Sequence, residues 1–322
     1  MQHLDIKETA FSKGLCKYIM HFKEQSKPGS HQFLLQREGL LGSFQCLRSK
    51  SVIRKFSEDD TLFCSIPSSL PEHIRIAMKR MFIRSEFLQA VAINGKKTYD
   101  FEHFLDGVRE EAPLYTSRVT YRLLDYNSNE MSFLGRFGDG KSRGCERLIK
   151  FHDLLEREIQ VVKIFAEEFD KEVTVLIPFC RSVKEVDLVR RAIREAIPSV
   201  SIGLMVETFI CLENLSDYIP ISCAFFGASD LLAEHECIAR TDIDYSQPHE
   251  LSEMSERVKM ALINQLPKIY KLGHLMEICT CKDLNNLKVD LPCSSISRTF
   301  MPDQLVLSDG KYLQQFRTKA LG

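Results

Sequence analysis

Residues 172–207 read EVTVLIPFCRSVKEVDLVRRAIREAIPSVSIGLMVE, and this stretch decides the fold class. Its two ends, residues 172–179 and 201–207, are continuous apolar runs, which are typical of strands covered on both faces. Between them, residues 182–197 combine apolar positions at helical spacing with a charged face. A strand, a helix and a second strand in this order predict a unit of two parallel strands joined by a helix.

The same alternation extends along the chain in both directions. Further strand-like runs lie at residues 32–41, 118–125, 223–230, 274–281 and 294–299. Helical patterns follow several of them, while residues 45–115 show a longer, mixed pattern that we interpret as a mainly helical excursion. We therefore expect an α/β fold in which residues 1–322 form one TIM (β/α)8-type barrel domain, with the helical excursion between the first strands.

Composition narrows the class of protein. The chain has 322 residues, and 43 Lys plus Arg against 44 Asp plus Glu give a net charge of −1, so no nucleic-acid or anionic-membrane partner is indicated. The first residues, MQHLDIKETAF, lack a signal-peptide pattern, and no segment is long and apolar enough to span a bilayer. Eleven scattered cysteines are typical of reduced thiols. We expect a soluble cytoplasmic protein.

One motif points to a different class. Residues 135–142, GRFGDGKS, match the phosphate-loop pattern, in which Lys141 would contact a nucleotide phosphate. Such a loop requires a strand running directly into it and a helix leaving it. A helical pattern follows, but the strand-like run 118–125 ends ten residues too early. A phosphate-loop nucleotide hydrolase therefore stays as an alternative, and a Gly-rich connection is the favoured interpretation.

Polar residues close several of the predicted strands. Arg122 and Asp125 end the run 118–125, Glu207 and Asp230 end two later runs, and Cys279 lies within the run 274–281. In a parallel barrel the carboxyl ends of all strands open onto one face, where catalytic groups gather. We expect these side chains to lie close together, although each could instead be an ordinary ion-paired strand end.

Six collinear segments carry a family resemblance over residues 116–300: TYRLLDYNSNE, SRGCERL, VTVLIPF, GLMVE, FFGASDLL and EICTC. In this order they resemble the C-terminal TIM-barrel domain of phosphoenolpyruvate-utilising enzymes, the family of pyruvate phosphate dikinase and phosphoenolpyruvate synthase. The present chain looks like a stand-alone, divergent form of that domain.

The resemblance implies a site and a chemistry. Glu207 and Asp230 match the family's metal ligands and would hold Mg²⁺, a cation that prefers a few carboxylate oxygens. Arg122 and Arg143 match substrate arginines, whose planar guanidinium groups suit phosphate and carboxylate, and Arg122 would also be catalytic. Cys279 matches a thiol that protonates the enolate of pyruvate, and Ser229 would contact substrate.

A function follows from these matches. The chain is expected to bind phosphoenolpyruvate or pyruvate with Mg²⁺ and to perform phosphoryl-transfer or enolate chemistry, as a phosphotransferase or a related lyase. Phosphoryl transfer would need a separate phosphohistidine carrier protein, because no carrier segment is recognised in the sequence. The resemblance also implies a homodimer.

Two departures from the family pattern leave an alternative open. The family's early G-I-G-L-x-R-T-E segment is aligned with REGLLGSFQ, which puts Gly42 where an arginine is expected. Ser229 stands where the family has an asparagine before the metal-binding aspartate. A catalytically degenerate binding or regulatory barrel is therefore the alternative function.

Overall fold

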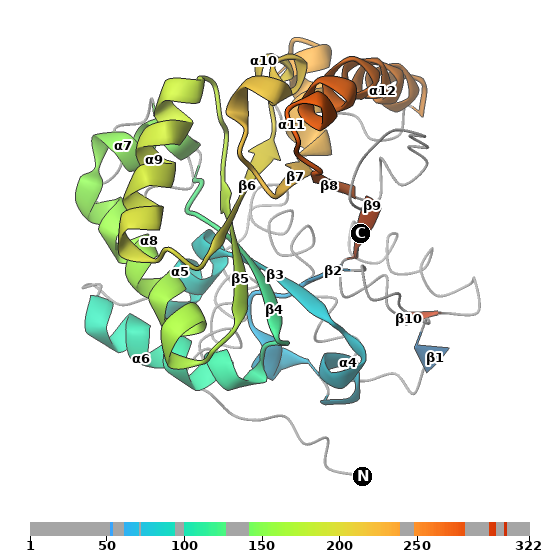
Figure 1. The fold of residues 1–322 in the computed structure, drawn as a ribbon. Helices are drawn as coiled ribbons and strands as arrows, with labels where there is room; N and C mark the ends of the chain where they lie inside the picture. Colours follow the sequence, from blue (N-terminus) through green and yellow to red (C-terminus); the bar gives the residue numbers. More distant parts are fainter. Residues whose placement is uncertain are drawn as a thin grey trace.

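The fold is seen in a computed structural model of the chain (Figure 1). The described residues are 52–53, 61–70, 72–93, 100–126, 142–238, 248–280, 296–300 and 306–307. Within these ranges no helix has the length and apolar character that crossing a membrane requires.

Eight parallel strands form the centre of the molecule. In chain order they are β2 (Thr61–Phe63), β3 (Arg80–Arg84), β4 (Arg118–Arg122), β5 (Glu172–Ile177), β6 (Ser201–Val206), β7 (Cys223–Phe226), β8 (Glu277–Thr280) and β9 (Ile296–Phe300). Each strand pairs with the next, and β9 also pairs with β2 through Thr61 and Leu62, which closes the ring. Two short strands, β1 (Val52–Ile53) and β10 (Val306–Leu307), form a separate antiparallel pair. The α/β fold is thus confirmed, and the curled parallel sheet is consistent with a TIM-type barrel.

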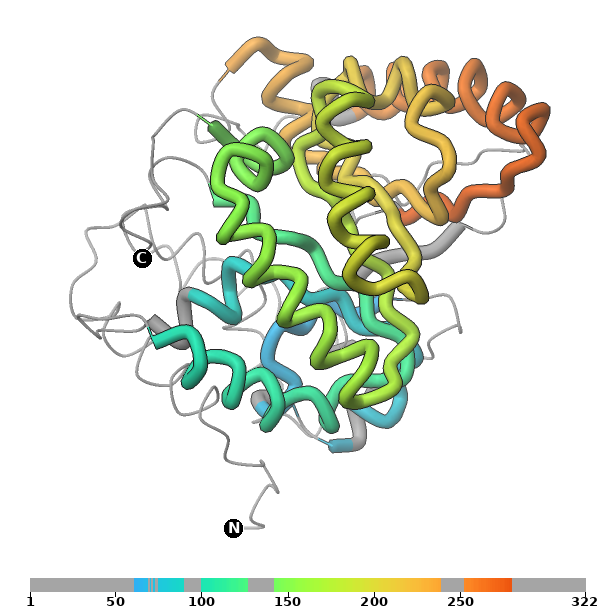
Figure 2. The backbone as a smooth tube through the Cα atoms, turned by 60° about the vertical axis from the view of Figure 1, so that its left-hand side comes forward, coloured from blue at the N-terminus to red at the C-terminus, as the bar shows by residue number. Residues whose placement is uncertain are grey.

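Helices connect the strands and cover the outside of the sheet (Figures 1 and 2). They are η1 (Pro67–Ser69), α4 (Glu72–Ala77), α5 (Ser85–Ile93), α6 (Phe101–Glu111), η2 (Ala112–Leu114), α7 (Gly144–Lys150), α8 (His152–Lys163), η5 (Ile164–Glu168), α9 (Val183–Ala196), α10 (Phe209–Glu213), η6 (Leu215–Tyr218), α11 (Ala228–His235) and α12 (Pro248–Lys271). Local capping fixes several of their starts: the hydroxyl of Ser182 accepts from Glu185 N at the start of α9, and that of Thr208 accepts from Cys211 N at the start of α10.

Alternation along the strands separates two apolar regions. Tyr121, Val175 and Ile202 belong to the large core between the sheet and the helices. Phe82, Leu176, Met205, Cys223, Phe225 and Cys279 form a second buried cluster. Because these side chains come from β3 and from β5 to β8 and alternate with the outer core, they fill the inside of the barrel.

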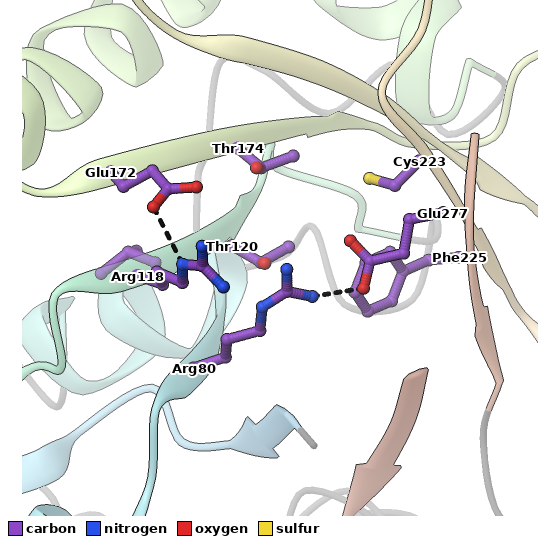
Figure 3. A pocket seen from close by; sticks show the side chains of 9 residues that line it. Arg80, Arg118, Thr120, Glu172, Thr174, Cys223, Phe225 and Glu277 are labelled. Atoms are coloured by element: carbon purple, nitrogen blue, oxygen red, sulfur yellow. Dashed lines mark hydrogen bonds and ion pairs between the residues drawn. The ribbon is translucent and has the colours of Figure 1, made fainter. Parts of the chain in front are cut away.

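The N-terminal ends of the strands carry ion pairs around a small hollow (Figure 3). Arg80 on β3 pairs with Glu277 on β8, and Arg118 on β4 pairs with Glu172 on β5 at 2.9 Å. In TIM barrels the N-terminal ends of the strands usually serve stability, and the active site lies at the opposite, C-terminal face. We interpret these pairs as closing the barrel floor.

The expected helical excursion over residues 45–115 is wrong in one respect. This stretch contains β2 and β3, which are strands of the barrel itself, together with η1, α4, α5, α6 and η2. The strand at the start of MFIRSEFLQAV was not recognised within this mainly helical stretch, because a short apolar run has no periodicity that separates a buried strand from a buried helix. The expected strand at residues 32–41 lies outside the described residues.

Candidate active site

Two buried charges from distant strands meet at the carboxyl ends of β4 and β6. Arg122 is the last residue of β4, and Glu207 directly follows β6. Arg122 Nη1 donates to Glu207 Oε1 at 3.4 Å, while Glu207 Oε2 accepts from the backbone N–H of Phe179 at 3.0 Å. Arg122 Nη2 also donates to Glu86 Oε1, so one guanidinium bridges two carboxylates.

A second arginine links two more carboxylates. Arg143, at the N-cap of α7, donates through Nε and Nη2 to both oxygens of Asp125, at 3.0 and 2.9 Å. Its Nη1 donates to Asp230 Oδ1 at 2.9 Å, in the first turn of α11. The ring of Phe179 lies 4.1 Å below the guanidinium carbon, which adds a cation–π contact. The structure therefore brings Arg122 to Glu207, and Arg143 to Asp125 and Asp230, while the roles assigned to these residues stay predictions.

Within this cluster, the negative charge of Glu207 is the least well compensated. Burial, together with the charges of Asp125 and Asp230, raises the pKa of Glu207, and Arg122 and Arg143 offset this only in part. Burial alone would also raise the pKa of Asp125, but the charges of Arg143 and Arg122 outweigh it and lower that pKa. Negative charge at Glu207 is thus incompletely compensated, a condition that an added cation would relieve.

The sequence interpretation missed a further buried arginine, Arg84. Gly42, which stands where the resemblance implies an arginine, lies outside the described residues. Arg84 ends the strand β3, and Ser85 and Glu86 begin α5. Arg84 Nε donates to Glu86 Oε1 at 3.0 Å, the same oxygen that Arg122 contacts. The signal available in the sequence was a charged segment, Arg84-Ser85-Glu86, directly after an apolar run, as at the ends of the other predicted strands. A third buried arginine therefore belongs to the cluster.

A buried carboxyl behind the strands supports the cluster. Glu158 on α8 is fully buried, and its oxygens accept from Ser85 Oγ at 2.7 Å and from the backbone N–H of Leu124 at 2.9 Å. Tyr121 OH, at 3.2 Å, and Gln89 Nε2, at 2.7 Å, complete its four hydrogen bonds. Three of these partners, Ser85, Tyr121 and Leu124, adjoin residues of the charged cluster in the chain, so Glu158 fixes the backbone that carries the site.

Two glycines permit the close packing of the site. A Cβ at Gly227 would lie 2.5 Å from Glu207 Cγ, so any larger residue would displace that carboxylate. Gly144 has φ +51°, and a Cβ there would lie 2.5 Å from Phe179 Cβ. Only glycine therefore lets α7 begin directly after Arg143.

Cys279 and Ser229 are not part of the charged cluster but lie near it. Cys279 pairs in register with Phe225 on β7, and Gly227, which borders Glu207, lies two residues further along. Two residues along a strand span about 7 Å, which puts Cys279 one interior layer below Glu207. Ser229 is half-buried and precedes Asp230 in α11. The roles predicted for these two residues stay predictions.

The carboxylates of this cluster are possible ligands of a divalent cation. The described part of the chain contains no group of three or more His, Cys, Asp or Glu side chains that could hold a metal ion unaided. Mg²⁺, however, is commonly held by one or two carboxylates plus substrate oxygens, a requirement that Glu207 and Asp230 fit. Glu86 Oε2 is also buried and accepts no hydrogen bond from the described residues. The donor set thus suits a magnesium ion shared with a substrate.

The phosphate-loop motif cannot be placed. Residues 135–141, including Lys141, lie outside the described residues. Ser142, the last residue of the motif, accepts a hydrogen bond at its carbonyl from Arg147 Nη2.

Comparisons with known proteins show a distant, partial similarity between this chain and one enzyme. No family model matches the chain. A probable phosphoenolpyruvate synthase of Methanocaldococcus jannaschii is 29% identical over 147 residues, which is 40% of this chain and 12% of that protein. This chain therefore corresponds to only a small part of that enzyme. The crystal structure of the citrate synthase SbnG superposes with a TM-score of 0.38 and 11% identity, covering 81% of this chain and 89% of that one, a likeness too distant to bear on function.

Proposed function

We propose that this chain binds phosphoenolpyruvate or the enolate of pyruvate together with Mg²⁺ at the carboxyl ends of the barrel strands. The observation that carries the proposal is the clustering of Arg122 and Glu207, at the ends of β4 and β6, with Arg143 and Asp230, at the starts of α7 and α11. The distant similarity to a phosphoenolpyruvate synthase supports the same substrate class. Phosphoryl transfer or enolate chemistry is the reaction we expect there.

The arginines supply the anion-binding part of the site. Arg122 and Arg84 share one oxygen of Glu86, and Arg143 is gripped at two points by Asp125. These carboxylates hold the guanidinium groups in place before substrate arrives, which lowers the entropy lost on binding. A phosphate or carboxylate of the substrate would take further guanidinium N–H donors, in the geometry that such anions prefer.

The remaining carboxylates supply the cation-binding part. Glu207 and Asp230 would hold Mg²⁺ and complete its coordination with substrate oxygens. When bound, the ion would stabilise negative charge on the enolate and phosphate oxygens. Arg143 contacts Asp230, so the guanidinium that would bind the substrate lies beside a carboxylate that would hold the ion.

We assign to Cys279 the protonation of the enolate carbon, which would give pyruvate. Its thiol lies in the apolar layer beneath Glu207, beside Phe225, with a side chain only 1% exposed. The thiol would donate its proton to the enolate carbon and be left as a thiolate, which a proton from solvent would restore. Complete transfer of a phosphoryl group would still require a histidine on a separate carrier protein.

Ligand-dependent thermal stability tests the proposal. The purified chain is heated with Mg²⁺ plus oxalate, a mimic of enolpyruvate, with Mg²⁺ plus phosphoenolpyruvate, and with each ligand plus a chelator. A ligand present at a hundredfold excess over its Kd stabilises the folded state by about 2.7 kcal/mol. We expect an upward shift in Tm that requires Mg²⁺ and disappears in Glu207→Gln and Asp230→Asn.

The control is Glu172→Gln, which removes a carboxylate at the opposite end of the barrel and should leave the shift intact. A shift with Mg²⁺ plus ATP alone would support the phosphate-loop alternative instead. No shift with any ligand would overturn the proposal. A shift without formation of pyruvate from phosphoenolpyruvate, with or without added unphosphorylated histidine carrier proteins, would favour the binding or regulatory alternative.

A further inference from the structure

Phe179 has a backbone conformation that bulky residues rarely adopt. Its φ is +48°, in the left-handed region, where a Cβ is strained. Two other non-glycine residues in the described ranges share this conformation, Asp170 at +49° and Cys237 at +55°. Each of those lies one residue beyond the C-cap of a helical segment, where left-handed residues are common. Phe179 instead lies two residues beyond β5, beside the charged cluster, so helix termination does not explain its strain.

Hydrogen bonds hold the peptide unit before Phe179 at both of its polar atoms. The carbonyl of Pro178 accepts from Cys145 N at 2.9 Å, in the first turn of α7. The N–H of Phe179 donates to Glu207 Oε2 at 3.0 Å. This peptide plane is therefore fixed between α7, which begins directly after Arg143, and the carboxylate that follows β6.

The aromatic ring of Phe179 contacts the guanidinium of Arg143. Its centre lies 4.1 Å from the guanidinium carbon, and the side chain of Phe179 is half-buried. A ring face at this distance attracts the cation and covers one side of its plane. Arg143 is thereby held where its N–H groups reach Asp125 and Asp230.

The left-handed φ of Phe179 makes these two contacts possible together. Because the peptide plane is fixed, rotation about the N–Cα bond decides the direction of the side chain. A change of φ from +48° to the usual helical value of about −63° would swing Cβ by about 110° around that bond and carry the ring off Arg143. The strained conformation thus keeps the ring on Arg143 while the N–H stays on Glu207.

We propose that Phe179 is a positioning residue, which fixes the guanidinium of Arg143 relative to the carboxylate of Glu207 and so sets the affinity for the anionic ligand. The inference rests on the proposed function, in which Arg143 binds the anion and Glu207 the cation. Phe179 joins these two halves of the site through its ring and its N–H. Without the ring, Arg143 populates other rotamers, and the apparent affinity falls with the fraction of molecules that keep the competent geometry.

Titration calorimetry with oxalate in the presence of Mg²⁺ tests the role of the ring. Phe179→Leu keeps the N–H and most of the bulk but lacks an aromatic face, so Kd should rise about fivefold. Phe179→Tyr restores the face and should bring Kd back to within about twofold of the wild type. The matched control is Phe101→Leu, which removes the contact between Phe101 and Arg157 at 4.9 Å. Phe101 starts α6, well away from α7 in Figure 1, so this variant should leave Kd unchanged.

A second pair of variants tests the role of the backbone. Phe179→Gly and Phe179→Ala both lack the ring, but only glycine adopts a left-handed φ without strain. The glycine variant should therefore have the higher Tm, by about 2 °C, although both variants should bind oxalate about fivefold more weakly than the wild type. A residue with a purely structural role would change Tm and leave Kd unaffected.

The outcomes separate this inference from the proposed function. No Mg²⁺-dependent binding of oxalate by the wild type would overturn both. Binding by the wild type with an equal Kd in Phe179→Leu would overturn the positioning role alone, and so would a glycine variant that is no more stable than the alanine variant.

Discussion

Replacing Glu158 by glutamine should change how stability depends on pH. Burial raises the pKa of this carboxyl to about 7, although hydrogen bonds from Ser85, Leu124 N and Tyr121 oppose the shift. The folded chain therefore binds a proton at Glu158 over a pH range in which the unfolded chain has lost it. Stability must then fall as pH rises through this range, because the folded state alone has to bury the charge.

The size of the effect follows from the shift. The pKa moves from 4.5 to about 7, and each unit corresponds to about 1.36 kcal/mol. The wild type should lose roughly 2 to 3 kcal/mol between pH 5 and pH 8 through this group. Glu158→Gln never buries a charge, but its amide nitrogen faces hydrogen-bond donors, at a cost of about 1 to 3 kcal/mol that is independent of pH.

Urea unfolding followed by circular dichroism at several pH values measures the difference. We expect the wild type to be the more stable protein at pH 5 and the gap to close or reverse by pH 8. Glu156→Gln, on the same helix with an exposed side chain, is the matched control and should show a constant difference. A gap between wild type and Glu158→Gln that does not change with pH would refute the reasoning.

Three further substitutions have definite expected outcomes. Gly227→Ala would push Glu207 aside, so the chain should fold yet lose its Mg²⁺-dependent shift with oxalate, as thermal melts would reveal. Gly203→Ala would overlap Cys223 Sγ inside the barrel and should lower the free energy of unfolding by about 1 to 3 kcal/mol, measurable in urea. Cys279→Ala should keep oxalate binding but slow pyruvate formation about 100-fold or more, and an unchanged rate would remove the thiol from the mechanism.

Local pattern was sufficient where a strand was long and fully apolar. The segments that form β5 and β6, and the helix α9 between them, were predicted because apolar residues dominate both strands and recur at helical spacing in the helix. It was insufficient for β2, which has only three residues, and for β3, whose run merges into α5. Arg84 and Glu86 were overlooked for the same reason, since their strand was not recognised.

The sequence by itself determined the α/β class and the polar residues that end the strands, because both depend on neighbours within one element. Only the tertiary structure decided which charges meet: Glu86 contacts Arg122 across 36 positions, and Arg143 contacts Asp230 across 87. It also decided that Cys279 lies one layer below Glu207, since strand register sets depth inside the barrel. Pairing between strands is a property of the closed ring, and no local window of sequence contains it.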